Sequence, residues 1–158
     1  MKILSIVIAG TILITIGFIL NIEPTSTEQI MEEQETLEKE QKATTILVNG
    51  VALDVEIADT RERQIQGLSG RESLGENSGM LFVYEEPGLP GIWMKDMNFP
   101  IDIVWITSEK RIVSTSKDID PSTYPTTFKS HEPVQYILEV NAGWLDKKGI
   151  DVGQEVSF

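Results

Sequence analysis

The hydrophobic pattern divides the chain into three parts, and the first is an uninterrupted apolar run. Residues 3–20 carry no charged side chain and follow a single lysine, Lys2. This length just suffices to cross the hydrocarbon core of a bilayer as a helix. No small-x-small cleavage triplet follows, so residues 1–22 predict an uncleaved signal anchor, with secretion after cleavage as the alternative. Because positive charge stays inside, the protein is expected in the cytoplasmic membrane, single-pass, with its C-terminal part outside.

The second part, residues 23–43, is polar and acidic. It contains seven acidic and two basic residues, with too few large apolar side chains to form a core. We interpret it as a solvated acidic linker, partly helical at most, between the anchor and a folded domain.

The third part, residues 44–158, alternates between short apolar segments and turn signals, which is typical of β-strands. Asn49-Gly50 lies between two apolar runs and predicts a hairpin over residues 46–58, because both residues accept a positive φ. Further strands are expected at residues 79–84, 101–107, 111–116 and 135–140, with residues 152–158 closing the domain. The stretch from Trp93 to Ile103 is interpreted as two strand segments joined at Asn98-Phe99-Pro100.

Only two short helices interrupt the predicted strands. The first covers residues 59–68, with Asp59 as N-cap, and the second covers residues 141–148, with Asn141 as N-cap. The sequence shows no parallel βαβ pattern. Residues 44–158 are therefore expected to form a single, mainly β domain, a sandwich or barrel with one or two short helices.

Composition narrows the possible partners. The net charge is −12, and residues 44–158 alone hold 18 acidic and 10 basic residues. Nucleic acids and anionic lipid surfaces are bound by clustered Lys and Arg, so both are disfavoured. The chain has no cysteine, which excludes disulfides, thiol catalysis and Cys-ligated zinc. The only histidine, His131, has no second ligand at metal spacing, so we expect neither a metal nor a cofactor.

Four spaced segments carry a resemblance to a known family. They are Arg63-x-x-x-Gly67-Leu68-x-x-Arg71, Gly79-Met80-Leu81-Phe82, Trp93-Met94-Lys95 with Pro100-Ile101-Asp102, and Tyr136-Ile137-Leu138-Glu139-Val140-Asn141-Ala142-Gly143. Together they resemble the family called domain of unknown function 192. The resemblance implies a compact, mainly antiparallel β fold of jelly-roll type, often secreted or membrane-anchored in prokaryotes, and it implies no particular reaction.

The candidate ligand-binding residues are polar or aromatic side chains within these segments: Arg63, Arg71, Trp93, Lys95, Asp102 and Glu139. Arg71 would bind a carboxylate or sugar hydroxyls through its guanidinium. Trp93, with Trp105 and Trp144, would offer indole faces for stacking on sugar rings; the alternative is that these tryptophans are core. For the charged residues the alternative is a structural ion-pair network.

Two functions are compatible with these patterns. The first is a membrane-tethered extracytoplasmic module of the cell envelope that binds a small molecule or carbohydrate, or serves as an accessory domain. The second is a hydrolase or isomerase acting on envelope carbohydrate, with Asp102 and Glu139 as an acid and base pair roughly 5–9 Å apart. One concave pocket that holds Arg71, Lys95, Asp102 and a tryptophan face would separate the two functions, and a binding module would show this pocket without a carboxylate of raised pKa.

Overall fold

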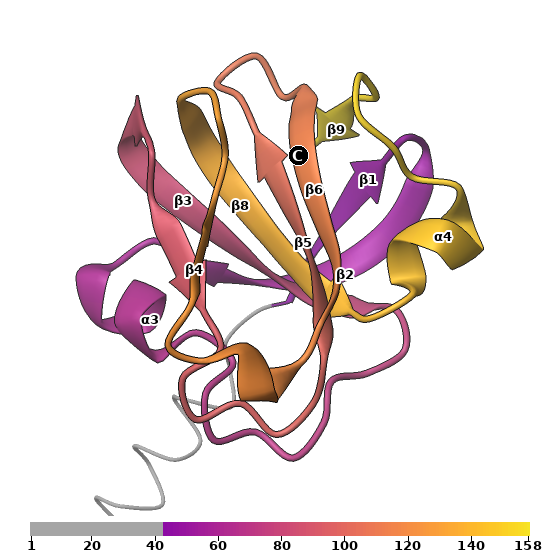
Figure 1. The fold of residues 1–158 in the computed structure, drawn as a ribbon. Helices are drawn as coiled ribbons and strands as arrows, with labels where there is room; N and C mark the ends of the chain where they lie inside the picture. The colour runs from indigo at the N-terminus through magenta and orange to yellow at the C-terminus, as the bar shows by residue number, and fades with distance from the viewer. Residues whose placement is uncertain (1–42) are drawn as a thin grey trace, which may run out of the picture. The chain divides into compact units, whose positions relative to one another are not determined.

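The computed structural model describes residues 43–158, and the anchor and linker predictions lie outside them. Residues 43–158 belong to one compact unit. Its elements are β1 (Thr44–Val48), β2 (Val51–Ala58), α3 (Arg61–Gln66), β3 (Ser78–Gly88), β4 (Gly91–Trp93), β5 (Ile101–Ile106), β6 (Ile112–Ile119), the 3-10 helix η1 (Pro121–Thr123), β7 (Thr127–Lys129), β8 (Val134–Asn141), α4 (Trp144–Lys148) and β9 (Val156–Ser157) (Figure 1). None of the helices in this part is long and apolar enough to cross a membrane.

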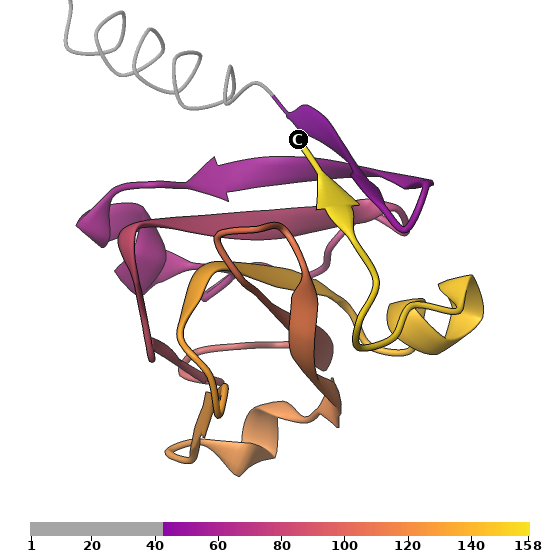
Figure 2. The same ribbon diagram turned by 90° about the horizontal axis from the view of Figure 1, so that it is seen from above.

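Seven strands form one curled sheet in the order β6-β5-β8-β3-β2-β1-β9, and β4 pairs with β7 in a separate two-stranded ribbon. The predicted hairpin is confirmed: β1 and β2 pair from Val48↔Val51 outward, and Asn49 and Gly50 have φ values of 48° and 79°. Figures 1 and 2 show α3 and α4 at opposite ends of this sheet. The mainly β prediction with two short helices is confirmed.

The fold is mainly antiparallel, as the resemblance implies, but the structure contains one parallel βαβ unit that the sequence pattern does not show. β2 and β3 run parallel, from Asp54↔Ser78 to Ala58↔Phe82, and α3 lies in the connection between them. The sequence pattern missed this unit because α3 has only six residues and buries none of them. It therefore shows no apolar stripe at helical spacing.

The sheet curls until its two edges meet, which makes a half-barrel rather than two stacked sheets. Arg111, before β6, bridges to Glu155, before β9. The Arg111 guanidinium also donates to the Gly153 carbonyl at 2.7 Å and to the Glu155 carboxylate at 2.9 Å. Of the two predicted architectures, the barrel is therefore closer to the structure than the sandwich.

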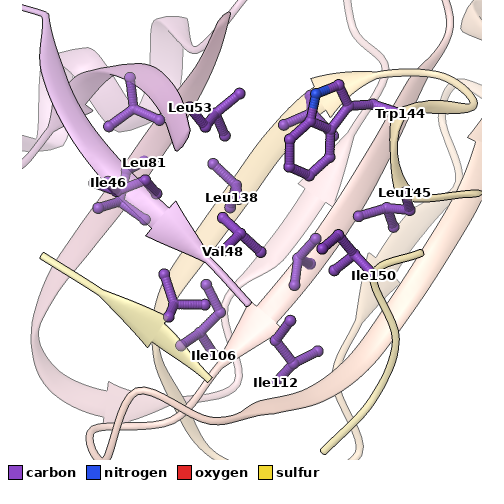
Figure 3. Close-up of a cluster of buried hydrophobic side chains, with 14 residues drawn as sticks. Ile46, Val48, Leu53, Leu81, Ile106, Ile112, Leu138, Trp144, Leu145 and Ile150 are labelled. Atoms are coloured by element: carbon purple, nitrogen blue, oxygen red, sulfur yellow. The ribbon is translucent and has the colours of Figure 1, made fainter. Parts of the chain in front are cut away.

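Side chains from all seven strands of the sheet and from α4 pack inside the curl, as an inner core (Figure 3). Trp144 and Leu145 of α4 are 3% and 0% exposed and close one end of it. On the other face of the sheet, an outer core forms beneath the β4–β7 ribbon and the segment after α3; its largest members are Trp105, Phe82, Leu68 and Met94. Because both faces are covered, all six residues of β5 are buried.

The helix caps differ from the predicted ones. Thr60, not Asp59, caps α3, and its hydroxyl accepts from the Arg63 amide at 3.3 Å. The residue before α4 is Gly143, which has no side chain to accept. Asn141 instead donates from its amide to the Gly75 carbonyl at 2.8 Å. The acceptor at the start of α4 is Asp102, a fully buried residue of β5.

Asp102 joins three elements through its carboxylate. One oxygen accepts from the Asp118 amide in β6 at 2.9 Å, and the other accepts from the Leu145 amide in α4 at 3.1 Å. The Leu145 amide is buried and would otherwise lack a partner, which is costly, whereas the bond to the Asp118 amide is partly buried. Asp102 is therefore a structural residue that ties α4 and the end of β6 to β5.

Candidate functional site

The best candidate site is a narrow pocket on the outer face of the sheet, with Glu139 of β8 at its floor. The pocket has a volume of about 30 Å³, and its walls come from α3 and the residues after it, from β4, and from Phe82 and Met97. Glu139 reaches this face because β8 alternates: Leu138 and Val140 belong to the inner core, and the residue between them points the other way. In the register, Glu139 lies between Met80 of β3 and Ile103 of β5.

The carboxyl group of Glu139 lies in an unusual environment. The residue is 4% exposed, and no residue within 43–158 donates a hydrogen bond to its carboxylate. Burial raises its pKa to about 8, against a smaller lowering by the Arg71 guanidinium. A carboxyl shielded from water prefers its neutral form because the charged form loses its hydration.

Arg71 lies near Glu139 but is held by another partner. Its guanidinium makes a two-pronged ion pair with Glu56 of β2; Nη1 bonds Oε1, and Nη2 donates to Oε2 at 2.8 Å. Hydrogen bonding by Arg71 lowers the pKa of Glu56, and the pKa of Arg71 is raised in turn. Arg71 is therefore committed to Glu56 and is not available to neutralise Glu139.

The wall of the pocket is built by backbone contacts after α3. Gly67 ends the helix with φ 50°, a conformation that favours glycine, and its amide donates to the Arg63 carbonyl at 2.8 Å. The next residues bond to the chain that follows β4: Ser69 Oγ donates to the Lys95 carbonyl and the Gly70 amide donates to the Asp96 carbonyl, both at 2.8 Å. These bonds fix the distance between the two walls.

A wider hollow of about 250 Å³ adjoins the pocket and shares Ile65, Gln66, Ser69 and Trp93 with it. Lys95 and Asp96 line its outer end. We call the pocket and the hollow together the Glu139 groove. Two large apolar side chains border it in the open, Ile65 at 61% and Trp93 at 47% exposure. The rings of Trp93 and Tyr124 contact each other edge-to-face, with centroids 6.4 Å apart and an interplanar angle of 70°.

The structure brings together three of the six candidate residues, Trp93, Lys95 and Glu139, around this groove. Arg71 lies beside it. Arg63 is elsewhere; its guanidinium is 3.5 Å from the Asp59 carboxylate. The predicted ion-pair network does not form, because no two of the charged candidates pair with each other within residues 43–158. Of the tryptophans, Trp105 and Trp144 are core and only Trp93 is exposed.

The acid and base pair of Asp102 and Glu139 is wrong. In the register of β5 and β8, Asp102 faces Val140 and Glu139 faces Ile103. Neighbouring positions along a strand point to opposite faces, so the two carboxylates lie on opposite sides of the sheet. Asp102 is also fully used as a backbone acceptor. A glycosidase-type mechanism through these two residues is excluded.

Several groove residues were not predicted from the sequence. Phe82 and Met97 carry only the signal of ordinary core residues. Gln64 lies on a polar helix, yet its side-chain amide donates to the Val83 carbonyl at 2.8 Å and the Ala58 carbonyl at 3.3 Å. These contacts dock α3 on the sheet and depend on long-range packing that no local pattern reveals.

Comparison with known proteins identifies relatives of the same fold. Residues 44–158 match the model of the DUF192 family, described as "Uncharacterized ACR". A crystal structure from Sinorhizobium meliloti 1021, of a protein provisionally described as a transcription regulator, is 30% identical with a TM-score of 0.68, covering 72% of this chain and 91% of that one. A protein of unknown function from Novosphingobium aromaticivorans DSM 12444 is 27% identical with a TM-score of 0.70, covering 73% and 85%. No curated protein matches the chain significantly.

Proposed function

The chain belongs to the DUF192 family, which is described without a reaction, and from this premise we propose that it is a binding module of the cell envelope. In this proposal residues 1–22 anchor it in the cytoplasmic membrane, residues 23–43 form an acidic spacer, and residues 44–158 stand outside. The Glu139 groove takes a small molecule or a carbohydrate.

One observation carries the proposal: a buried carboxyl without a hydrogen-bond donor lies at the floor of a pocket, beside an exposed tryptophan. A carboxyl that lines a pocket and has no donor among residues 43–158 is free to accept a hydrogen bond from a ligand. The raised pKa of Glu139 alone would also suit an enzyme. Asp102, however, lies on the opposite face of the sheet, and the other carboxylate of the groove, Asp96, lies at its outer end beside Lys95, which favours binding over hydrolysis by a carboxylate pair.

Carbohydrate suits the groove for three reasons. The exposed indole of Trp93 offers an apolar face on which a sugar ring stacks. Gln66 and Ser69 add an amide and a hydroxyl along the wall, and Glu139 offers a polar group at the floor. Nucleic acid is disfavoured by the net charge of −12, although one relative is described as a regulator of transcription.

We expect Trp93→Ala to weaken binding of an envelope oligosaccharide by the full chain about tenfold or more, because loss of one stacked aromatic ring costs about 1.4 kcal/mol. Calorimetric titration of oligosaccharides identified in a glycan screen measures this. The control is Leu89→Ala, since Leu89 is similarly exposed at 53% but does not line the groove. Equal affinity of both variants, or no binding by the wild type, would overturn the proposal.

The tether makes a separate prediction. We expect the full chain to stay with the membrane fraction after high-salt and alkaline washing, and a reporter fused after Phe158 to be active only outside the cytoplasm. Deletion of residues 1–22 removes the apolar run and should leave the remainder in the supernatant of disrupted cells. A reporter active in the cytoplasm, or full release of the intact chain by salt alone, would contradict the anchor. A mature N-terminus near residue 21 would instead favour secretion.

A further inference from the structure

The charge balance of the Glu139 groove narrows the ligand further than carbohydrate in general. Glu139 lies at the floor of the pocket, and the residue is 4% exposed. Among residues 43–158, the cation near Glu139 is Arg71, and its guanidinium already forms a two-pronged ion pair with Glu56. The remaining positive group of the groove, Lys95, is half exposed at the outer end, where its Nζ lies 4.0 Å from Asp96. Among residues 43–158, no cation therefore pairs directly with the acid of the pocket, although Arg71 acts on it from a distance.

The other groups that face Glu139 add no positive charge. Its sheet neighbours Met80 and Ile103 are apolar. Tyr84 of β3 is near enough for Glu139 to help raise its pKa to about 12, so its phenol stays neutral. α3 contributes the amide of Gln64, which is bonded to backbone carbonyls, and β4 contributes Trp93 and Ile92.

The walls suit a cation. Phe82 and Trp93 line the pocket, and Met97 adds a polarisable sulfur. Aromatic faces attract ammonium groups through their quadrupole, and a desolvated setting strengthens this attraction. The acidic net charge of −12 further favours the approach of a positively charged ligand.

We propose that the Glu139 groove recognises its ligand through a primary ammonium group, which enters the pocket and pairs with the Glu139 carboxylate. The proposal rests on the binding function above and names its ligand class. The pocket, at about 30 Å³, has room for a group of water-like size and not for a ring. The ring or chain that carries the ammonium group then occupies the hollow beside Trp93. An amino sugar and a lysine side chain share this chemistry.

Pairing with an ammonium group has a consequence for protons. Free Glu139 holds its proton at pH 7, because its pKa is raised to about 8. An ammonium group favours the ionised carboxylate, so binding at pH 7 releases a proton from Glu139. Affinity should therefore rise as pH increases from about 6 towards 8, and should fall again once the amine of the probe loses its own proton.

The test compares matched amines and amides on the full chain by calorimetric titration. One arm uses glucosamine against N-acetylglucosamine, and the other uses Nα-acetyl-lysine amide against its Nε-acetylated form. At pH 8 we expect the amine of at least one pair to bind at least tenfold tighter than its acetylated partner, and the arm that shows this identifies the source. At pH 7 the binding heat should change with the ionisation enthalpy of the buffer, which reports the released proton.

Two variants separate the pocket from general charge attraction. Glu139→Gln should abolish the preference for the amine, and Glu132→Gln, which removes the same charge at an exposed position, should keep it. A preference that survives in Glu139→Gln overturns the inference, as does equal binding of amine and amide by the wild type. If neutral sugars bind in a Trp93-dependent way without any amine preference, the binding function stands and only the ammonium inference fails. If no probe of either class binds, both fail.

Discussion

Asp102→Ala is expected to lower the free energy of unfolding by about 3–5 kcal/mol, because it orphans two backbone donors at once. The Asp118 and Leu145 amides, at 2.9 and 3.1 Å from the carboxylate, would both lose their acceptor, and water does not readily reach the buried Leu145 amide to replace it. Such a loss lowers the melting temperature of a domain of this size by on the order of 10 °C or more. Thermal and denaturant unfolding of the full chain, followed by circular dichroism, measures both quantities.

Two further variants sharpen this result. Asp102→Asn keeps one acceptor oxygen but turns an N–H group toward the second donor, so it should lose about half as much stability. Asp54→Ala removes a carboxylate on the surface that accepts only from the Thr45 hydroxyl at 2.7 Å, and it should change stability by about 0.5 kcal/mol or less. If Asp102→Ala behaves like Asp54→Ala, the buried carboxylate does not hold α4 and β6.

Glu139→Gln is expected to stabilise the protein at pH 8 by about 2–4 kcal/mol and to have little effect near pH 5. The pKa of Glu139 rises from 4.5 to about 8 on folding. Below pH 4.5, Glu139 is protonated in both the folded and the unfolded chain, so its burial does not destabilise the folded state. As pH rises, the unfolded chain ionises while the folded chain resists, so wild-type stability falls until pH passes about 8. At about 1.4 kcal/mol per pKa unit, the raised pKa of Glu139 destabilises the wild-type protein by nearly 5 kcal/mol at high pH. Glutamine removes this destabilisation, but burial of its polar amide cancels part of the gain.

Unfolding curves at half-unit steps from pH 5 to 9 measure the effect, and the difference between variant and wild type should grow with pH up to about 8 and then level off. The range stops at pH 5 because Glu56 loses its pairing with Arg71 under more acidic conditions, and both proteins would then lose stability together. Glu132→Gln serves as control and should follow the wild type throughout. A constant offset between Glu139→Gln and the wild type would mean that Glu139 is not the titrating group.

These two carboxylates show where inference from the sequence succeeds and where it stops. Asp102 stands between Ile101 and Ile103 in a predicted strand, and its burial follows from these local neighbours. Whether it could meet Glu139 depends on the register of β5 against β8, residues far apart in the chain. One step of register moves a side chain to the other face. No local pattern determines the register of β5 against β8. The sequence could therefore suggest the pair of Asp102 and Glu139 but could not test it.

The same contrast runs through the fold. Asn49-Gly50 carries its own turn geometry, so the first hairpin was predictable from four or five residues. The parallel pairing of β2 and β3 was not, because the connecting α3 leaves Ile65 at 61% exposure and shows no buried face. β7 was hidden within a loop because three residues, two of them polar and exposed, give no strand signal. Among the groove residues, the sequence indicated Trp93, Lys95 and Glu139. It did not indicate the residues that form the walls between them, such as Phe82 and Met97.

The weak attachment of α3 has a consequence for how the groove works. A helix of six residues is too short to persist alone, and this one buries no side chain. It is held by its Thr60 cap and by the two bonds of the Gln64 amide. Regions with so few buried contacts open locally at a fraction of the global free energy of unfolding. One wall of the groove thus belongs to a part of the domain with few buried side chains, and any opening of that wall would have to be reversed when a ligand binds, at a cost in entropy.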